Sequence, residues 1–219
     1  REKNLSVSVH TIEGTNFAEK VNRIRKASVD ILRDTLEMAD YIDAGWVVVH
    51  VGNAGFSCTD KEKKKVRGEI AAQSIREAME LYSDCRTRIA LENLYRYPPE
   101  QKKCKIGSDI EEFELFFRWI NSDKVGLLYD MGHDHICNGE SDCGKHFLEV
   151  LRDKVIAMHI HYNDGVEDLH YGLDKYVLSS YQRELDLIGT LKNEVCLVCE
   201  SYTPKENIAS QEILRRYSH

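Results

Sequence analysis

The sequence has few of the features that mark linkers, membrane spans and phosphate-binding loops. It contains only three prolines and neither a GxGxxG nor a GxxxxGKS/T motif. The scarcity of proline argues against interdomain linkers, and no run of about 18 apolar residues is present to form a transmembrane helix. The missing glycine-rich motifs remove the usual signature of an open, doubly wound sheet. The N-terminus lacks a basic segment followed by an apolar one, so we expect a cytoplasmic chain.

Positive charge is also scarce. Thirty lysines and arginines stand against 37 aspartates and glutamates, which gives a net charge of −7. This balance is not that of a general nucleic-acid-binding protein, although it leaves room for a local basic groove. The 219 residues, 42% of them apolar, are enough for one domain with a sizeable hydrophobic core.

The seven cysteines form no standard ligand pattern. Their number is odd, and four fall in predicted loops at spacings that match no common zinc or iron–sulfur site: Cys58, Cys104, Cys137 and Cys143. We expect free thiols in a reducing compartment.

Short apolar segments alternate with helical patterns along the chain. Six segments rich in Val, Ile and Leu are predicted strands, at residues 5–10, 46–51, 88–92, 125–130, 155–160 and 195–200. Strands that alternate with helices indicate βαβ units and a parallel sheet.

Two of the predicted helices carry informative patterns. In the first, apolar residues recur at spacings of three and four, which predicts a buried face made of Phe17, Val21, Ile24, Ala27 and Ile31. The lysine-rich run 61–65 is predicted to be the solvated start of another helix.

Each predicted strand is followed by, or ends in, a side chain that can bind metal or move protons. These residues are His10, His50, Glu92, Asp130, His161 and Glu200. In an open sheet they would be spread along one edge, whereas in a (β/α)₈ barrel the carboxyl ends of the strands meet at one mouth. The pattern therefore favours an α/β fold of the TIM-barrel type, although only six strands are found.

Four of these residues form the most informative set. Glu92, Asp130, His161 and Glu200 combine three carboxylates with one imidazole, a set that suits Mn²⁺, Zn²⁺, Co²⁺ or Mg²⁺. Carboxylates on buried strands need a cation or a metal nearby to remain charged. We therefore predict a divalent metal site.

A second set of polar residues follows the same strand ends: His10, His50, His133, Asp168 and His170. They could hold further zinc ions, orient the first set, or contact a substrate. His159 lies two residues before His161 and faces the same side of its strand, so we interpret it as a deeper hydrogen-bonding neighbour of the ligand His161. Three further histidines are interpreted as non-ligands: His135, His146 and His219.

The motifs VVVHVGNAG, IALENL, LLYDMGH, MHIHYND, EDLHYGL and LVCES occur in this order with helix-sized gaps. Together they resemble the xylose-isomerase-like TIM barrels, a superfamily shared by sugar phosphate isomerases, epimerases and endonuclease IV. The resemblance covers nearly the whole chain and implies one barrel domain over residues 1–219. It also implies that Glu92, Asp130, His161 and Glu200 carry one metal ion.

The two branches of this superfamily imply different activities. In the endonuclease IV branch nine ligands hold three zinc ions, and the matching positions all carry the right residue types: His10, His50, Glu92, Asp130, His133, His161, Asp168, His170 and Glu200. Against that branch, Asn53 and Ala54 replace its Ser-His pair, and LYRYPP replaces its glycine-rich loop. We therefore expect a metal-dependent sugar or sugar phosphate isomerase or epimerase, which binds nucleic acid only if the alternative holds.

The resemblance also suggests roles for single residues. Glu92 and Glu200 would lie on opposite sides of a bound sugar, where one removes a proton beside the carbonyl and the other returns it through an enediolate. His133 would hold a substrate oxygen, and His159 and Asn93 would contact the substrate. In the alternatives, the chain cleaves phosphodiesters beside abasic sites in DNA, or binds a ligand without turning it over.

The first two βα units of the family, about 60 residues by typical unit size, have no counterpart here. The resemblance places His10 at the end of the family's third strand, only nine residues after Arg1. A barrel wall left open in this way would expose strand edges, so a partner chain, such as a second copy, could cover it.

Overall fold

The computed structural model describes residues 6–55, 60–101, 103–145, 147–175, 182–191 and 195–216. They pack into two compact units. The first consists of Arg1–Glu92 and Arg96–Gly126, and the second of Asn93–Tyr95 and Leu127–His219. The expectation of one domain over residues 1–219 stays a prediction.

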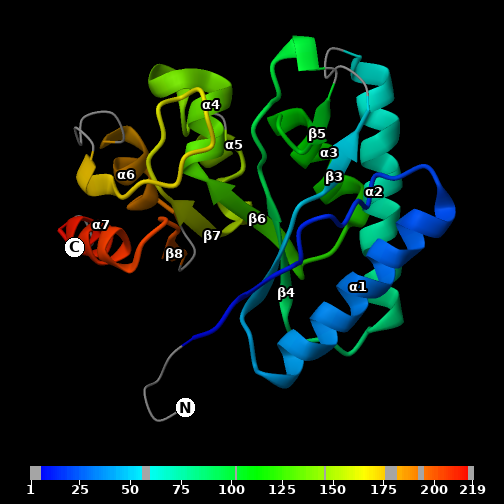
Figure 1. The fold of residues 1–219 in the computed structure, drawn as a ribbon. Helices are drawn as coiled ribbons and strands as arrows, with labels where there is room; N and C mark the ends of the chain where they lie inside the picture. Colours follow the sequence, from blue (N-terminus) through cyan, green and yellow to red (C-terminus); the bar gives the residue numbers. More distant parts are fainter. Residues whose placement is uncertain are drawn as a thin grey trace. The chain divides into compact units, whose positions relative to one another are not determined.

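The first unit is a parallel sheet with helices on it. Its strands pair in the order β1 (Val9–His10), β2 (Trp46–Val49) and β4 (Arg88–Glu92). The helices are α1 (Asn22–Tyr41), α2 (Lys61–Leu81) and α3 (Ile110–Ile120), and α2 runs alongside both α1 and α3 (Figure 1).

A small antiparallel ribbon completes the first unit. It pairs β3 (Gly52–Ala54) with β5 (Cys104–Ile106), so the chain after β2 lies beside the chain before α3. A short 3₁₀ helix, η1 (Pro99–Gln101), precedes β5. The ribbon was not predicted, because both strands are only three residues long.

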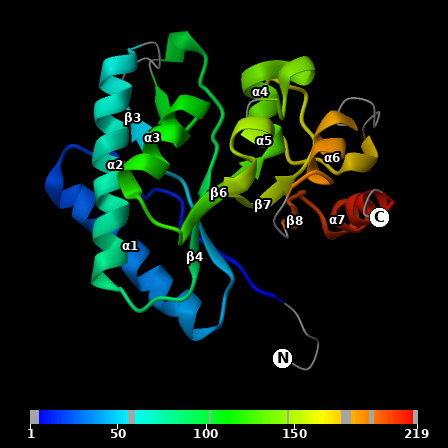
Figure 2. The same ribbon diagram turned by 180° about the vertical axis from the view of Figure 1, so that it is seen from behind.

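The second unit repeats the strand–helix alternation. Its parallel strands are β6 (Val125–Asp130), which begins in the first unit, β7 (Val155–Ile160) and β8 (Cys196–Cys199). Its helices, visible from behind in Figure 2, are α4 (Met131–Asp142), α5 (Phe147–Val150), α6 (Gln182–Ile188) and α7 (Pro204–Leu214). Two 3₁₀ helices, η2 (Arg152–Lys154) and η3 (Leu173–Lys175), join these elements.

The strand predictions are confirmed. β4, β6 and β7 have the predicted bounds, and β2 and β8 fall within theirs. Every residue of β6 and β7 is buried, as expected for parallel strands covered on both faces. β1 is shorter than predicted, and Leu5 lies outside the described residues. No helix among the described residues is long and apolar enough to cross a membrane.

The predicted buried face of α1 is wrong. The buried residues of α1 are Ser28, Val29, Leu32, Leu36 and Ala39. Of the predicted set, Phe17 is buried but lies before the helix, whereas Val21, Ile24 and Ala27 are exposed. The helix carries two apolar stripes, and spacing alone does not tell which one meets the sheet.

The expectation of free thiols is wrong at one position. Cys104, on β5, is disulfide-bonded, whereas five other cysteines are free: Cys85, Cys137, Cys143, Cys196 and Cys199. Cys58 lies outside the described residues.

The lysine-rich start of α2 is not uniformly solvated. Lys64 is buried, and its ammonium lies 2.9 Å from the Ser108 hydroxyl, 2.7 Å from Glu112 Oε2 and in contact with Asp109. Burial raises the pKa of Glu112 although Lys64 opposes this shift. The same carboxylate accepts the backbone N–H of Asp109, at the start of α3. Lys64 thus ties α2 to α3.

Replacing Lys64 tests this tie. We expect Lys64→Ala to lower the free energy of unfolding by about 3 kcal/mol, because it leaves the Glu112 carboxylate without its buried cation, whereas Asp109 keeps its ion pair with Arg96. Lys63→Ala is the matched control, since Lys63 lies one residue earlier, is 62% exposed and forms a surface ion pair with Asp60. The control should cost less than about 0.5 kcal/mol. Urea denaturation measures the free energy of unfolding of both variants. An equal decrease in the two would contradict the role of Lys64 in joining α2 to α3.

Candidate metal centre

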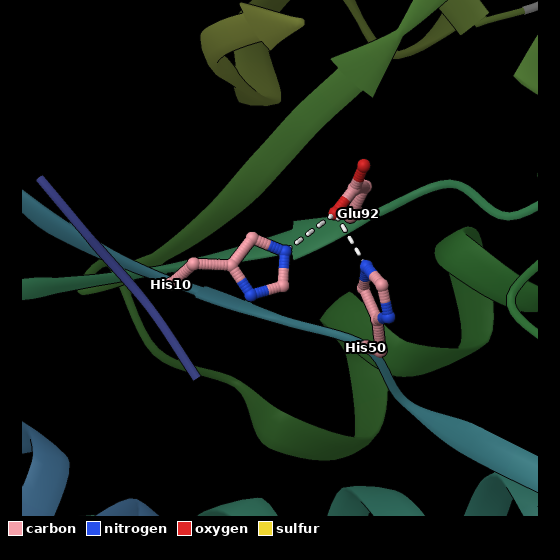
Figure 3. A group of neighbouring side chains, drawn as sticks. All are labelled: His10, His50 and Glu92. Atoms are coloured by element: carbon pink, nitrogen blue, oxygen red, sulfur yellow. Dashed lines mark hydrogen bonds and ion pairs between the residues drawn. The ribbon is translucent and has the colours of Figure 1, made fainter. Parts of the chain in front are cut away.

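In the first unit, three predicted site residues come together at the ends of adjacent strands. His10 ends β1, His50 follows β2, and Glu92 ends β4. Both imidazoles point at the same carboxylate oxygen (Figure 3): Nε2 of His50 lies 2.8 Å, and Nε2 of His10 3.5 Å, from Glu92 Oε2. Glu92 is only 2% exposed, so water does little to stabilise the charge of its carboxylate. These three residues form a group that could hold a metal ion.

In the second unit, Asp130 is the centre of the arrangement. It ends β6, is fully buried, and caps α4 by accepting the backbone N–H of His133. Nε2 of His161 lies 3.2 Å from each of its carboxylate oxygens. Burial alone would raise the pKa of Asp130, but His133 and His161 outweigh burial and hold it well below its usual range. Asp130 is therefore a buried anion surrounded by imidazoles.

Asp168 collects a second group of histidines in the same unit. Nε2 of His133 lies 3.3 Å from Asp168 Oδ2, and Nε2 of His170 lies 3.4 Å from Oδ1. The rings of His161 and His170 stack at 4.0 Å. His161, Asp168 and His170 form another group that could hold a metal ion.

The pKa values of this group reflect the pairing. Burial opposes the shift, but hydrogen bonds from His133 and His170 hold the pKa of Asp168 well below its usual range. Burial would lower the pKa of His170, yet the hydrogen bond and charge of Asp168, with help from Glu200, raise it.

Glu200 follows β8 and contacts a histidine other than the predicted one. Its Oε2 lies 2.9 Å from Nδ1 of His159 and 3.7 Å from Nδ1 of His170. His159 is also within 3.7 Å of Asp130. His159 and His161 therefore both face Asp130, as their spacing of two predicted, and the choice of His161 as the ligand stays a prediction.

Four of these histidines share one orientation. The Nδ1 atoms of His10, His133, His161 and His170 lie 2.7–3.0 Å from the backbone carbonyls of Thr11, Asn93, Leu169 and Glu200. A carbonyl oxygen only accepts, so each Nδ1 carries a proton and donates it. In a neutral imidazole, Nε2 then holds the lone pair, and here each Nε2 faces a carboxylate.

A lone pair that faces a carboxylate is repelled unless a cation lies between them or the ring takes a second proton. Metal-binding histidines have this same outer bond from Nδ1, which directs Nε2 to the ion. The donor set of imidazole nitrogens and carboxylate oxygens suits Zn²⁺ or Mn²⁺. The residues present therefore fit a divalent metal.

Gly132 and Asn163 support His161, although neither was among the predicted site residues. A Cβ on Gly132 would lie 2.1 Å from Cε1 of His161, so only glycine allows the ring to take this position. Asn163 donates to the carbonyl of Gly132 and bonds Nδ1 of His135. A glycine soon after the predicted ligand Asp130 was the available signal.

The remaining predicted residues are placed as follows. Asn93 is buried, and its amide both donates to the carbonyl of Asp130 and accepts its N–H, so its observed contacts are structural and its substrate contact stays a prediction. His135 is buried, and its Nδ1 atom is hydrogen-bonded to Oδ1 of Asn163. His146 and His219 lie outside the described residues. Glu92 belongs to the first unit and Asp130, His161 and Glu200 to the second, so their union in one metal site stays a prediction.

Comparison with known families agrees with these motifs. The family model described as "Xylose isomerase-like TIM barrel" matches residues 1–216. The chain belongs to this family. The resemblance inferred from the motifs is thereby confirmed, and the fold is of the α/β TIM-barrel-like class, with six parallel strands present.

The curated relatives are longer than this chain. Uncharacterized protein MJ1311 of Methanocaldococcus jannaschii is 24% identical over 92% of the chain, and uncharacterized protein MJ1614 of the same organism is 27% identical over 83%. The chain spans 66% of the length of each.

Solved structures share the fold. A D-tagatose 3-epimerase-like protein has a TM-score of 0.79 at 24% identity, covering 99% of this chain and 78% of its own. TTHB071 protein from Thermus thermophilus, soaked with ZnCl₂, has a TM-score of 0.72 at 17% identity, covering 97% and 78%. Endonuclease IV from the same organism has a TM-score of 0.69 at 19% identity, covering 97% and 76%.

Replacing Gly132 tests the support of His161. We expect Gly132→Ala to displace the ring and weaken zinc affinity by about 10–100-fold, because the orientation of the histidine changes. Affinity is measured by competition with a chromogenic chelator, and folding by circular dichroism. Gly55→Ala is the control, since a Cβ there meets nothing within 4 Å. Unchanged zinc affinity in a folded Gly132→Ala protein would contradict the role.

Proposed function

We propose that this chain binds a divalent metal, Zn²⁺ or Mn²⁺. We further propose that it acts as a metal-dependent isomerase or epimerase of sugars or sugar phosphates. The observation that carries the proposal is the shared orientation of His10, His133, His161 and His170. Their Nδ1 atoms donate to carbonyls while their Nε2 atoms face the carboxylates of Glu92, Asp130 and Asp168. Family membership supports it. We propose one metal ion per chain for the isomerase or epimerase activity, and up to three for the alternative, endonuclease-type activity.

The metal ligands proposed are Glu92, Asp130, His161 and Glu200, with His10, His50, His133, Asp168 and His170 as further metal or substrate contacts. When bound, the ion polarises the substrate carbonyl and makes the neighbouring C–H acidic. Of Glu92 and Glu200, one would accept the proton as a carboxylate from the carbon beside the carbonyl. The other, in its protonated form, would donate its own proton to the opposite face of the enediolate.

The environments of the two glutamates suit such an exchange. Glu92 is almost fully buried, so its carboxylate is poorly hydrated, whereas the side chain of Glu200 is 37% exposed and can exchange protons with water. The side chain of His133 is 5% exposed, and its Nε2 atom is proposed to hold a substrate oxygen. His159 and Asn93 are proposed to contact the substrate.

Substitution of the glutamates tests the proton transfer. We expect Glu200→Gln and Glu92→Gln each to lower the exchange of substrate hydrogen with D₂O by about 10²–10⁴-fold, because an amide cannot accept the proton. Exchange is followed by NMR on a panel of ketoses, aldoses and their phosphates. Glu167→Gln, an exposed site, should leave the rate unchanged. Exchange that survives both substitutions would overturn the assignment.

Endonuclease-type phosphodiester cleavage is the second candidate. The observation in its favour is that His10, His50, His133, Asp168 and His170 all lie in clusters able to hold metal or contact its ligands. The net charge of −7 works against it, because phosphate contacts dominate affinity for DNA.

Metal content separates the two candidates. We expect close to one ion per chain by elemental analysis after gentle purification, and loss of hydrogen exchange on chelation that Mn²⁺ or Zn²⁺ restores. Close to three zinc ions, together with cleavage of abasic-site DNA, would instead support the endonuclease function. A chain that takes up no metal from excess Zn²⁺ or Mn²⁺ would contradict both.

A further inference from the structure

The ribbon of β3 and β5 brings together the two segments in which this chain departs from the endonuclease IV pattern. Asn53 and Ala54, which replace a Ser-His pair, lie on β3. The LYRYPP segment, which replaces a glycine-rich loop, leads through η1 into β5. In the ribbon Asn53 pairs with Lys105, and Ala54 with Cys104. What is particular to this chain is therefore gathered in one small structure beside α2 (Figure 1).

The two faces of this ribbon differ in polarity. Cys104 and Ile106 are buried against the first unit. Lys103 and Lys105 are two positions apart in an extended segment, so their side chains extend to the opposite face. Asn53 lies directly across from Lys105 and shares that face. We call Asn53, Lys103 and Lys105 the basic face of the ribbon.

Both lysines of the basic face converge on one aromatic ring. The ammonium of Lys103 lies 5.6 Å, and that of Lys105 5.5 Å, from the centroid of the Tyr97 ring. The ring attracts each ammonium, but two positive charges beside the same ring repel each other. An anion that contacts both ammonium groups would offset this repulsion. The arrangement therefore suits a ligand group that carries more than one negative charge.

The basic face lies close to the site residues of the first unit. β3 begins two residues after His50. A Cβ on Gly107, which follows β5, would lie 3.7 Å from the backbone oxygen of Glu92. A strand rises about 3.3 Å per residue, so Lys105 is about 7 Å along the chain from this point of close approach. A ligand of a few carbon atoms could thus extend from Glu92 and His50 to the basic face.

Positive charge is concentrated around β5, although the whole chain has a net charge of −7. Residues 94–106 carry four basic side chains and one acidic side chain. A local positive potential raises the concentration of a small anionic substrate near the site. A nucleic acid would need phosphate contacts along a much longer surface, which the charge of the rest of the chain opposes. The charge distribution therefore favours a small anion.

We propose that the basic face holds the phosphate group of a phosphorylated substrate, so that the chain acts on sugar phosphates in preference to free sugars. A phosphate ester carries a charge of about −1.5 to −2 at pH 7, which matches the two ammonium groups. Lys103 and Lys105 would neutralise it, and the amide of Asn53 would donate a hydrogen bond to one of its oxygens. This inference rests on the proposed isomerase or epimerase function, because it names the substrate class of that same site.

Binding of inorganic phosphate to the full chain tests the basic face without any turnover. A titration followed by ³¹P NMR gives the Kd. We expect Lys103→Gln and Lys105→Gln each to weaken phosphate binding about tenfold, because each removes one charged donor. Lys205→Gln is the matched control, since Lys205 is exposed on α7 and the change in charge is the same. Circular dichroism checks that each variant is folded. Equal affinity in all variants and in the unaltered chain would overturn the proposal.

Exchange of substrate hydrogen with D₂O tests the substrate class. For a ketose phosphate, Lys105→Gln should raise KM about tenfold and change kcat less than about twofold, because the phosphate lies away from the reacting carbon. Lys105→Arg should recover part of the lost affinity, since it keeps the positive charge. The corresponding free ketose should exchange more slowly, and at the same rate with and without Lys105→Gln. Equal exchange of ketose and ketose phosphate would overturn this inference and leave the proposed function intact.

The two experiments also separate this inference from the proposed function. Phosphate binding that depends on the lysines, without hydrogen exchange in any sugar or sugar phosphate, would support the basic face and contradict the isomerase or epimerase function. Binding of abasic duplex DNA that depends on Lys103 and Lys105, without such binding of inorganic phosphate, would assign the basic face to a phosphodiester partner. That outcome would overturn the proposal.

Discussion

The site depends on keeping carboxylates charged where water is scarce. Glu92 and Asp130 end buried strands and are almost inaccessible to solvent. An isolated buried carboxylate would take up a proton, but imidazoles surround each of these two. The cost of burial therefore determines the neighbours: each strand end that delivers an acid needs a histidine from an adjacent strand or loop within reach.

Backbone carbonyls give those histidines their direction. The carbonyls of Leu169 and Glu200 each accept a hydrogen bond from an Nδ1–H, so the Nε2 atoms of His161 and His170 point toward Asp130 and Asp168. The loops that follow β7 and β8 thus orient these two imidazoles through their main chain. Such orienting bonds are typical of metal ligands, whose outer contacts matter nearly as much as the ligands.

The strands and the site residues were accessible from sequence because both follow from local pattern. A run such as VGLLYD has no charged residue before its last position, so it predicts a buried strand and a carboxylate at its end. The resemblance to the family then predicted that the residues at these strand ends share one metal site. Neither source describes how two units made of distant segments are placed, so the union of Glu92 with Asp130 stays a proposal.

What the sequence left open depends on contacts between distant segments. Lys64 belongs to a lysine-rich run whose composition predicts solvation, and only the packing of α2 against α3 shows that one of these lysines is buried between carboxylates. Pairing of the three-residue strands β3 and β5 likewise has no local signal.

The burial of α1 likewise depends on contacts with distant segments of the chain. Its sequence contains two apolar stripes, one around Leu32 and Leu36 and the other around Ile24 and Met38. Helical periodicity shows that a stripe exists, but burial depends on which side the sheet occupies. The stripe predicted from spacing was not the one that the sheet covers. The helix therefore carries more apolar surface than the described residues of its own unit cover.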